Sequence, residues 1–107
     1  MSKKLVTKDY VDKKAISLSN LNQLLTIGSA TTLSFSELKN AKGIVIGILK
    51  ESNYNASFPL LNRDSQFFTI DSQFCYGSCD FSKGTLKITM NSNLTGTFLL
   101  TDILIIK

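Results

Sequence analysis

Apolar and polar residues alternate over most of the chain, and the alternation has the period of a β-strand. Residues 85–90 place Leu86, Ile88 and Met90 on one side and polar residues on the other, as expected for a strand buried on one face. Residues 43–50 are mostly apolar and rich in β-branched side chains, which predicts a strand buried on both faces. The pattern therefore predicts a sheet protein over most of the length.

The other strand candidates are short and are separated by turn-forming residues. Pro59 has no amide hydrogen to donate, so residues 57–61 are predicted to be an edge strand or irregular. Residues 66–70 and 72–76 are predicted to form one longer extended stretch. This succession of strands favours an antiparallel β-sandwich or a jelly-roll-like head. The remaining predicted elements are strands at 24–28, 31–35 and 97–107 and a one-turn helix or loop at 36–42.

The opening of the chain has a different period. Three apolar residues recur every seven positions, and a fourth lies between the last two. In a helix these four would share one stripe, which Lys14 interrupts. The four are Val11, Leu18, Leu21 and Leu25. A helix this short is marginal in water by itself. The stripe is therefore predicted to pack on a partner chain or on the rest of the same chain.

Together these patterns predict a mainly β protein in two parts. A short amino-terminal α-helix at residues 1–22 serves attachment and oligomerisation, and a small antiparallel β-sandwich, jelly-roll-like head occupies residues 23–107. No apolar run approaches the roughly 20 residues that cross a bilayer, and no secretory leader follows Met1. We therefore expect a soluble protein that is made in the cytoplasm and is not inserted in a membrane.

The net charge of +4 is unevenly distributed along the chain. Five of the twelve basic residues lie in the first fourteen positions, so the head is close to neutral. A nucleic-acid surface needs a basic patch on the folded domain, and Arg63 is the single arginine of the sequence. We therefore expect no nucleic-acid partner. The lysine-rich start is either a solvated terminus or an electrostatic docking tail.

The chain lacks the residues on which most catalysis depends. It has no histidine, which removes the usual general base and the ordinary hydrolase triads. The acidic residues that could pair as general acid and base, Asp64, Asp71 and Asp80, lie in turn-like segments. We expect no enzymatic activity, no catalytic residue and no cofactor.

Two cysteines and two tyrosines are candidates for other chemistry. Cys75 and Cys79 flank three residues, so they either face each other across a hairpin and form a disulfide or remain free thiols. Two thiolates without histidine are too few for a zinc site, and we expect no metal. Tyr54 and Tyr76 lie in turn-like segments, where they serve either the fold or stacking against a sugar ring. The seven phenylalanines are expected in the core.

Three segments carry a resemblance to a known class of proteins. Residues 5–12, Leu-Val-Thr-Lys-Asp-Tyr-Val-Asp, resemble the segment that opens the helical stalks of bacteriophage tail fibres and related virion appendages. Residues 94–107 look like the closing strands of the small β-sandwich heads that cap such fibres, and residues 31–48 are similar to the opening of those heads.

The resemblance implies a structural component of the virion. It would be a short head or tail fibre, or a capsid decoration protein, that forms a homotrimer with a coiled coil through Val11, Leu18, Leu21 and Leu25. Its amino terminus would dock on capsid or tail proteins, and its outward head would contact a glycan of the host surface or decorate the shell. The residues assigned to docking are Lys3, Lys4, Leu5, Val6 and Tyr10.

One alternative from another functional class stays open. The chain could be a free-standing carbohydrate-binding, lectin-like module that acts away from the particle. The absence of a leader and of tryptophan, together with the charged opening, disfavours it.

Overall fold

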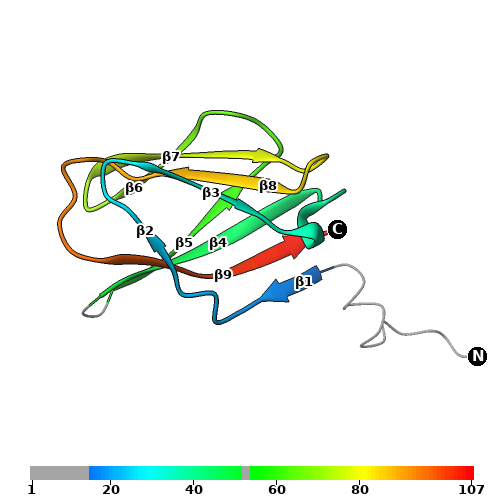
Figure 1. Ribbon diagram of the computed structural model, residues 1–107, viewed down its shortest axis with the longest axis horizontal. Helices are drawn as coiled ribbons and strands as arrows, with labels where there is room; N and C mark the ends of the chain where they lie inside the picture. Colours follow the sequence, from blue (N-terminus) through cyan, green and yellow to red (C-terminus); the bar gives the residue numbers. More distant parts are fainter. Residues whose placement is uncertain (1–14, 52–53) are drawn as a thin grey trace, which may run out of the picture.

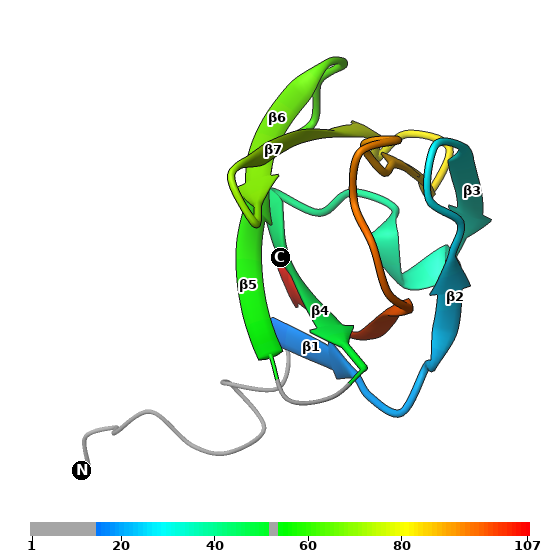
Figure 2. The ribbon, with the colours of Figure 1, turned by 90° about the vertical axis from the view of Figure 1, so that its left-hand side faces the viewer.

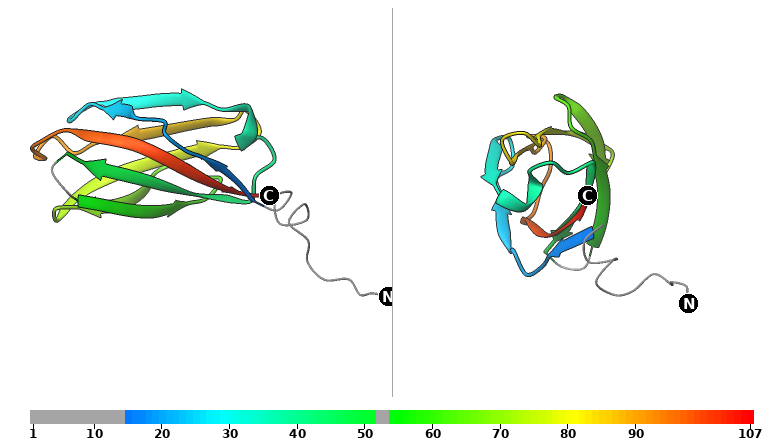
Figure 3. Two further views of the ribbon diagram at one scale, coloured as in Figure 1. Left: turned by 90° about the horizontal axis from the view of Figure 1, so that it is seen from below. Right: turned by 90° about the vertical axis from the view of Figure 1, so that its right-hand side faces the viewer.

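The computed structural model describes residues 15–51 and 54–107, which form two antiparallel β-sheets packed face to face (Figure 1). The strands of both sheets run roughly along the same direction (Figure 3). The predicted mainly β sandwich is thereby confirmed. The elements are β1 (Ala15–Leu18), β2 (Gln23–Leu25), β3 (Ala30–Ser34), the 3-10 turn η1 (Ser36–Leu38), β4 (Gly43–Lys50), β5 (Tyr54–Leu60), β6 (Gln66–Ile70), β7 (Gln73–Asp80), β8 (Thr85–Thr89) and β9 (Phe98–Ile106).

The two sheets have four strands each along their main path. The first has the order β1-β9-β4-β5, and β2 also pairs with β9, which makes it a sheet of five strands. The second has the order β3-β8-β7-β6. Figure 2 looks along the sandwich and shows the chain passing from β2 to β3 on one side, from the first sheet to the second. Pro59 lies on β5, at the edge of its sheet, as one of the two alternatives predicted.

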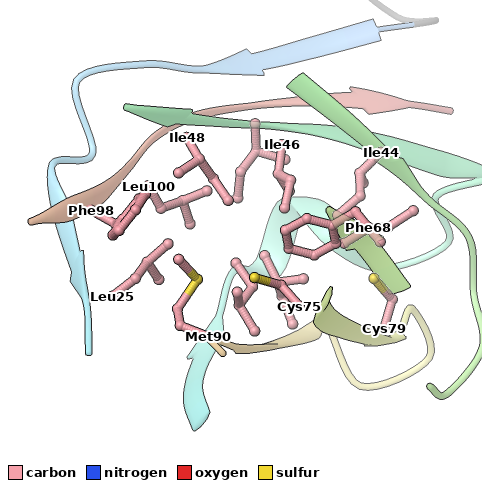
Figure 4. Packing of buried hydrophobic residues seen from close by; sticks show 14 of the residues in the cluster. Leu25, Ile44, Ile46, Ile48, Phe68, Cys75, Cys79, Met90, Phe98 and Leu100 are labelled. Carbon is pink, nitrogen blue, oxygen red and sulfur yellow. The ribbon is translucent and has the colours of Figure 1, made fainter. Parts of the chain in front are cut away.

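The core lies between the sheets and is built by alternate residues of each strand. On β4, Ile44, Ile46 and Ile48 are at most 1% exposed, and they point toward the side chains of the opposite sheet (Figure 4). Among those opposite side chains are Phe68 of β6 and Cys75 of β7. Because every second residue of a strand faces inward, the same alternation decides which residues are left on the surface.

The helix predicted over the opening residues is wrong within the described part of the chain. Residues 15–18 form β1, which pairs with β9 from Ala15 opposite Ile106 to Leu18 opposite Ile103. The backbone amide of Leu21 also donates to the carbonyl of Thr101, at 2.9 Å. The predicted boundary at residue 22 therefore falls inside the sandwich, whereas residues 1–14 lie outside the described residues.

Local backbone conformation explains why the heptad spacing does not produce a helix. Asn20 and Asn22 have φ of 57° and 47°, in the left-handed region that asparagine tolerates and a right-handed helix excludes. These two bends let Leu18 and Leu21 pack against the core from an extended chain. Pairing with the long β9 strand satisfies the backbone groups that a lone helix turn would have satisfied.

The single extended stretch predicted for residues 66–76 is a hairpin. Asp71 and Ser72 have φ of 50° and 65°, which is the signature of a two-residue type I′ turn between β6 and β7. The pair Asp-Ser lacks the glycine that usually marks such a turn. The sequence pattern therefore concealed the reversal of the chain at this point.

Candidate binding surfaces

Three aromatic side chains are exposed at one end of the outer face of the second sheet. Phe67 of β6 and Phe74 and Tyr76 of β7 are 66%, 52% and 48% exposed. The rings of Phe74 and Tyr76 stand nearly perpendicular to that of Phe67, with centroids 5.5 and 6.3 Å from it. We call these three residues the aromatic corner. The expectation that all seven phenylalanines lie in the core is wrong for Phe67 and Phe74.

The alternation of β6 and β7 forces these rings outward. Phe68 and Cys75 are buried, so their neighbours Phe67 and Phe74 must face the other side of the sheet. The same register continues along β7, where Cys79 is buried. The signal was present in the sequence, since two adjacent phenylalanines of one strand cannot both enter one core.

The rest of this outer face carries hydroxyl groups around one lysine. In the ladder, Ser78 of β7 lies opposite Lys87 of β8, and Lys87 lies opposite Thr32 of β3. Among the described residues, the Lys87 ammonium has neither an ion pair nor a hydrogen bond. We call the outward side of β3, β8, β7 and β6 the hydroxyl face. Its other hydroxyl residues are Ser34, Thr69, Thr85 and Thr89.

Three adjoining hollows occur on the hydroxyl face in the part of the chain that the structure describes. One of about 180 Å³ is lined by the aromatic corner, and one of about 130 Å³ extends from Tyr76 to Ser78 and Lys87. A third of about 350 Å³ shares Ser78 and Lys87 and reaches Asp64 and Asp80. Because neighbouring hollows share residues, they form one shallow track across the sheet.

Asp80 organises the turn at the far end of this track. Its Oδ1 accepts hydrogen bonds from the Ser82 hydroxyl at 2.6 Å and from the backbone amides of Ser82 and Lys83 at 3.0 and 3.3 Å. The hydrogen bond from the Ser82 hydroxyl is the main cause that lowers the pKa of the Asp80 carboxyl below its usual value. This carboxylate is thus committed to the turn that joins β7 to β8.

The outer face of the first sheet is aliphatic. Its outward positions on β2, β4 and β9 form cross-strand rows, such as Leu24 and Leu49 on either side of Leu99. Leu24 is 53% exposed and Leu104 and Ile106 are each 42% exposed. We call this set the aliphatic face. It consists of Leu24, Val45, Leu49, Leu99, Leu104 and Ile106.

A charged group also lies on this face. The Asp102 side chain lies across Gly47 of β4, where a Cβ would collide with its carboxylate. The Thr101 hydroxyl donates to that carboxylate at 2.9 Å. Gly47 therefore leaves room for a polar group that is held close to the sheet backbone.

The four residues predicted as one helical stripe do not form a stripe. Leu25 lies on β2 and is 1% exposed in the core, while Leu18 and Leu21 are partly buried against it. Val11 and the docking residues Lys3, Lys4, Leu5, Val6 and Tyr10 lie outside the described residues. The side chains of Leu18, Leu21 and Leu25 thus pack against the core of their own chain, because the extended backbone turns them toward the sandwich.

Cys75 and Cys79 do not face each other across a hairpin. Both are free and buried on the inward side of β7. Residues four apart on a strand are about 13 Å apart, beyond the roughly 7 Å that a disulfide spans. The disulfide alternative is therefore wrong. Burial raises the pKa of both thiols, to about 12 for Cys79, and for Cys75 a hydrogen bond with the backbone of Asn91 opposes the rise.

The remaining candidates are spread over the molecule. Tyr54 begins β5 of the first sheet, whereas Tyr76 lies on β7 of the second, so the two do not share a face. Asp71 pairs with Lys50 at 2.8 Å, at the opposite end of β7 from Asp80. The three aspartates considered for acid and base catalysis are therefore not brought together. The absence of enzymatic activity stays a prediction.

The described residues contain neither a candidate metal site nor a candidate membrane-spanning helix. Across residues 15–51 and 54–107, no three histidine, cysteine, aspartate or glutamate side chains gather as a metal site requires. Within the same ranges, no helix has the length and apolar character needed to cross a membrane.

No model of a known protein family matches the sequence, and no match is found among curated proteins or solved structures. The class of the protein is therefore set by its structure, as a sandwich of two antiparallel sheets with one aliphatic and one aromatic, hydroxyl-rich outer face.

Proposed function

We propose that this chain is a structural subunit of a bacteriophage particle, a short homotrimeric head or tail fibre with an outward, jelly-roll-like β head. The amino-terminal segment docks on capsid or tail proteins, and the head contacts the host surface. The observation that carries the assembly is the exposed aliphatic face. The resemblance of residues 5–12, 31–48 and 94–107 to virion appendages supports the assignment to a particle.

A face of this kind favours association. Exposed apolar surface gathered on one side of a folded protein marks an interaction site more often than a solvated side. Here the row of Gly47 and Asp102 separates two apolar groups of the same sheet face. Leu24, Leu104 and Ile106 each keep two fifths or more of their surface exposed. Covering them with apolar groups of a neighbour removes that area from water, at about 25 cal/mol per Å². The aliphatic face therefore replaces the helical stripe as the proposed contact between copies.

The size of the face argues for more than one neighbour. Three strands at about 4.8 Å spacing and nine residues at about 3.3 Å give a flat footprint of roughly 430 Å². A stable interface uses about 800 Å² on each partner. A closed ring in which each subunit meets two others buries more of each chain than a single contact does. Three copies about one axis supply that second contact.

Oligomer mass in solution tests the proposal. Light scattering on the purified full chain should give three times 11.8 kDa. The Leu104→Asp variant should shift the mass toward a monomer while the far-ultraviolet spectrum of the sheet is retained, because a carboxylate would enter an apolar contact without a partner. Phe67→Asp is the matched control, since Phe67 is 66% exposed and lies on the outer face of the other sheet.

Two outcomes would overturn the assembly. A wild-type chain that stays monomeric at micromolar concentration removes the trimer. A Leu104→Asp variant that assembles like the wild type removes the aliphatic face as its contact. Assignment to the particle is tested separately, by labelling purified virions with an antibody against the chain.

A further inference from the structure

We infer that the hydroxyl face is a binding site for a neutral oligosaccharide, which lies along the track from the aromatic corner to Thr32. The inference deepens the proposed function, because it supplies the contact between the outward head and the host surface. The site itself stands on the geometry of one sheet face.

The aromatic corner supplies the apolar part of such a site. A pyranose ring has a face of C–H groups, which packs on an aromatic ring by removing apolar surface from water. Phe67 is two thirds exposed, and the rings of Phe74 and Tyr76, both on the neighbouring strand β7, form T-shaped pairs with it. The three rings together line a hollow of about 180 Å³, several times the roughly 30 Å³ of one water molecule.

The neighbouring strands supply the polar part. Sugar hydroxyls both donate and accept hydrogen bonds, and the side chains that match them are hydroxyls and charged groups in fixed positions. Ser78, Lys87 and Thr32 lie side by side on three adjacent strands, starting one step along the face from Tyr76. Because these groups stand on strands of one sheet, their spacing is set by the sheet itself.

The three adjoining hollows together extend over more than one sugar ring. Tyr76 lines both the aromatic hollow and the central one, and Lys87 lines both the central hollow and the third. A chain of linked rings could therefore stack at one end and form hydrogen bonds further along. A single sugar would fill one hollow and leave the others open.

The charges on the face point to a neutral ligand. The third hollow is lined by Lys83 and Lys87 and by Asp64 and Asp80, so its formal charges cancel. A single-stranded nucleic acid also stacks on aromatic rings, but it requires a positively charged groove for its phosphates. A second copy of the chain would require apolar area, which this face offers only at the aromatic corner.

The position of the corner in the fold fits contact with an outside partner. Ala15, where the described chain begins, pairs with Ile106 at one end of the sandwich. The β6–β7 turn lies at the other end of the sandwich (Figure 1). Asp71 of this turn forms an ion pair with Lys50. Phe74 is the second residue after that turn. If the chain docks through its amino terminus, the aromatic corner is on the end that faces away.

The test is binding of defined oligosaccharides to the full chain. The probes are maltohexaose, cellohexaose and chitohexaose in solution, together with a printed array of neutral bacterial glycans, on which several copies of a subunit gain avidity. At least one neutral glycan should bind. Phe67→Ala and Tyr76→Ala should each weaken that binding about tenfold or more, and Lys87→Ala should weaken it by about threefold or more.

Leu61→Ala is the matched control, because Leu61 is as exposed as Tyr76 but is not part of the hydroxyl face. It should bind like the wild type, and all variants should keep the wild-type melting temperature within a few degrees. Tyr76→Phe keeps the ring and should retain most of the binding.

Each other outcome has a definite meaning. No binding to any neutral glycan, or equal binding by the wild type and Tyr76→Ala, overturns the inference. Tighter binding of an oligothymidine than of any glycan overturns it in favour of a nucleic-acid surface. Glycan binding by a wild-type chain that light scattering finds monomeric supports the inference, while it removes the trimeric fibre and favours a free-standing carbohydrate-binding module.

Discussion

Adjacent leucines of β2 give the most direct test of how the opening residues are placed. Leu25 is 1% exposed and pairs with Phe98, whereas Leu24 is 53% exposed and pairs with Leu99. Truncating a buried leucine to alanine removes its contacts and leaves a cavity, at a cost of about 2 to 5 kcal/mol. Leu25→Ala should therefore lower the free energy of unfolding by at least about 2 kcal/mol. Leu24→Ala should lower it by less than about 1 kcal/mol.

The loss is large relative to the whole molecule. A domain of this size is stable by roughly 5 to 15 kcal/mol, and each kcal/mol shifts its melting temperature by about 4 to 8 °C. Urea unfolding followed by circular dichroism should show a lower midpoint for Leu25→Ala with an unchanged slope. The measurement belongs at low protein concentration, because association would add to the apparent stability.

The reverse order would refute the assignment of this strand. If Leu24→Ala costs more than Leu25→Ala, then β2 is shifted by one residue and its two faces are exchanged. If neither substitution matters, then β2 does not contribute to the core, and the helical interpretation of the opening residues returns.

Two further predictions concern β7. Gly77→Ala should destabilise the fold by about 1 to 3 kcal/mol in urea unfolding, because a Cβ would lie 2.9 Å from a methyl of the buried Leu60. The further loss that Gly77→Ala causes should be smaller when it is measured against Leu60→Ala, which removes that methyl. An unchanged midpoint for Gly77→Ala would contradict the packing. Burial raises the pKa of the Cys79 thiol from 9.0 to about 12, so above pH 9 the folded chain keeps this proton while the unfolded chain loses it. The free energy of unfolding should therefore fall above pH 9 by up to about 1.4 kcal/mol per pH unit. Cys79→Ala should reduce that slope.

The strands could be predicted from sequence because their burial follows the residue pattern. The alternation of Leu86, Ile88 and Met90 gave β8, and the apolar run at 43–50 gave β4 with its correct limits. For β8 the local period agrees with the tertiary environment. The burial of β4 on both faces was wrong, because Val45 and Leu49 lie partly exposed on the outer face. A strand can be predicted in this way when the alternation of apolar and polar residues along the chain matches the alternation of its buried and exposed sides.

The opening segment shows the opposite case. A spacing of seven is compatible with a helix, but Leu18, Leu21 and Leu25 meet one core from a bent, extended chain whose partner, β9, is some eighty residues away in sequence. No local pattern reports such a partner. Tertiary pairing therefore overrode the periodicity.

The candidate surfaces were harder to predict than the fold. Tyr76 was singled out, but the residues that complete its surroundings, Phe67, Phe74 and Lys87, are brought to it by the pairing of β6, β7 and β8. Recognising them required the hairpin turn at Asp71, which the sequence did not mark with a glycine. The aliphatic face was missed for a similar reason, since Leu104 and Ile106 look like core residues until β9 is placed in its sheet.

The two outer faces lie on opposite sides of one core, and this separation gives the proposals independent tests. Sheets of a sandwich are about 10 Å apart, so substitutions on the two faces are separated by the whole core and should act additively. Oligomer mass reports on the side of Leu104, and binding of an oligosaccharide in solution, where avidity plays no part, reports on the side of Tyr76. A substitution that changes one measurement without the other therefore identifies the face that is involved. A loss of folding would change both measurements.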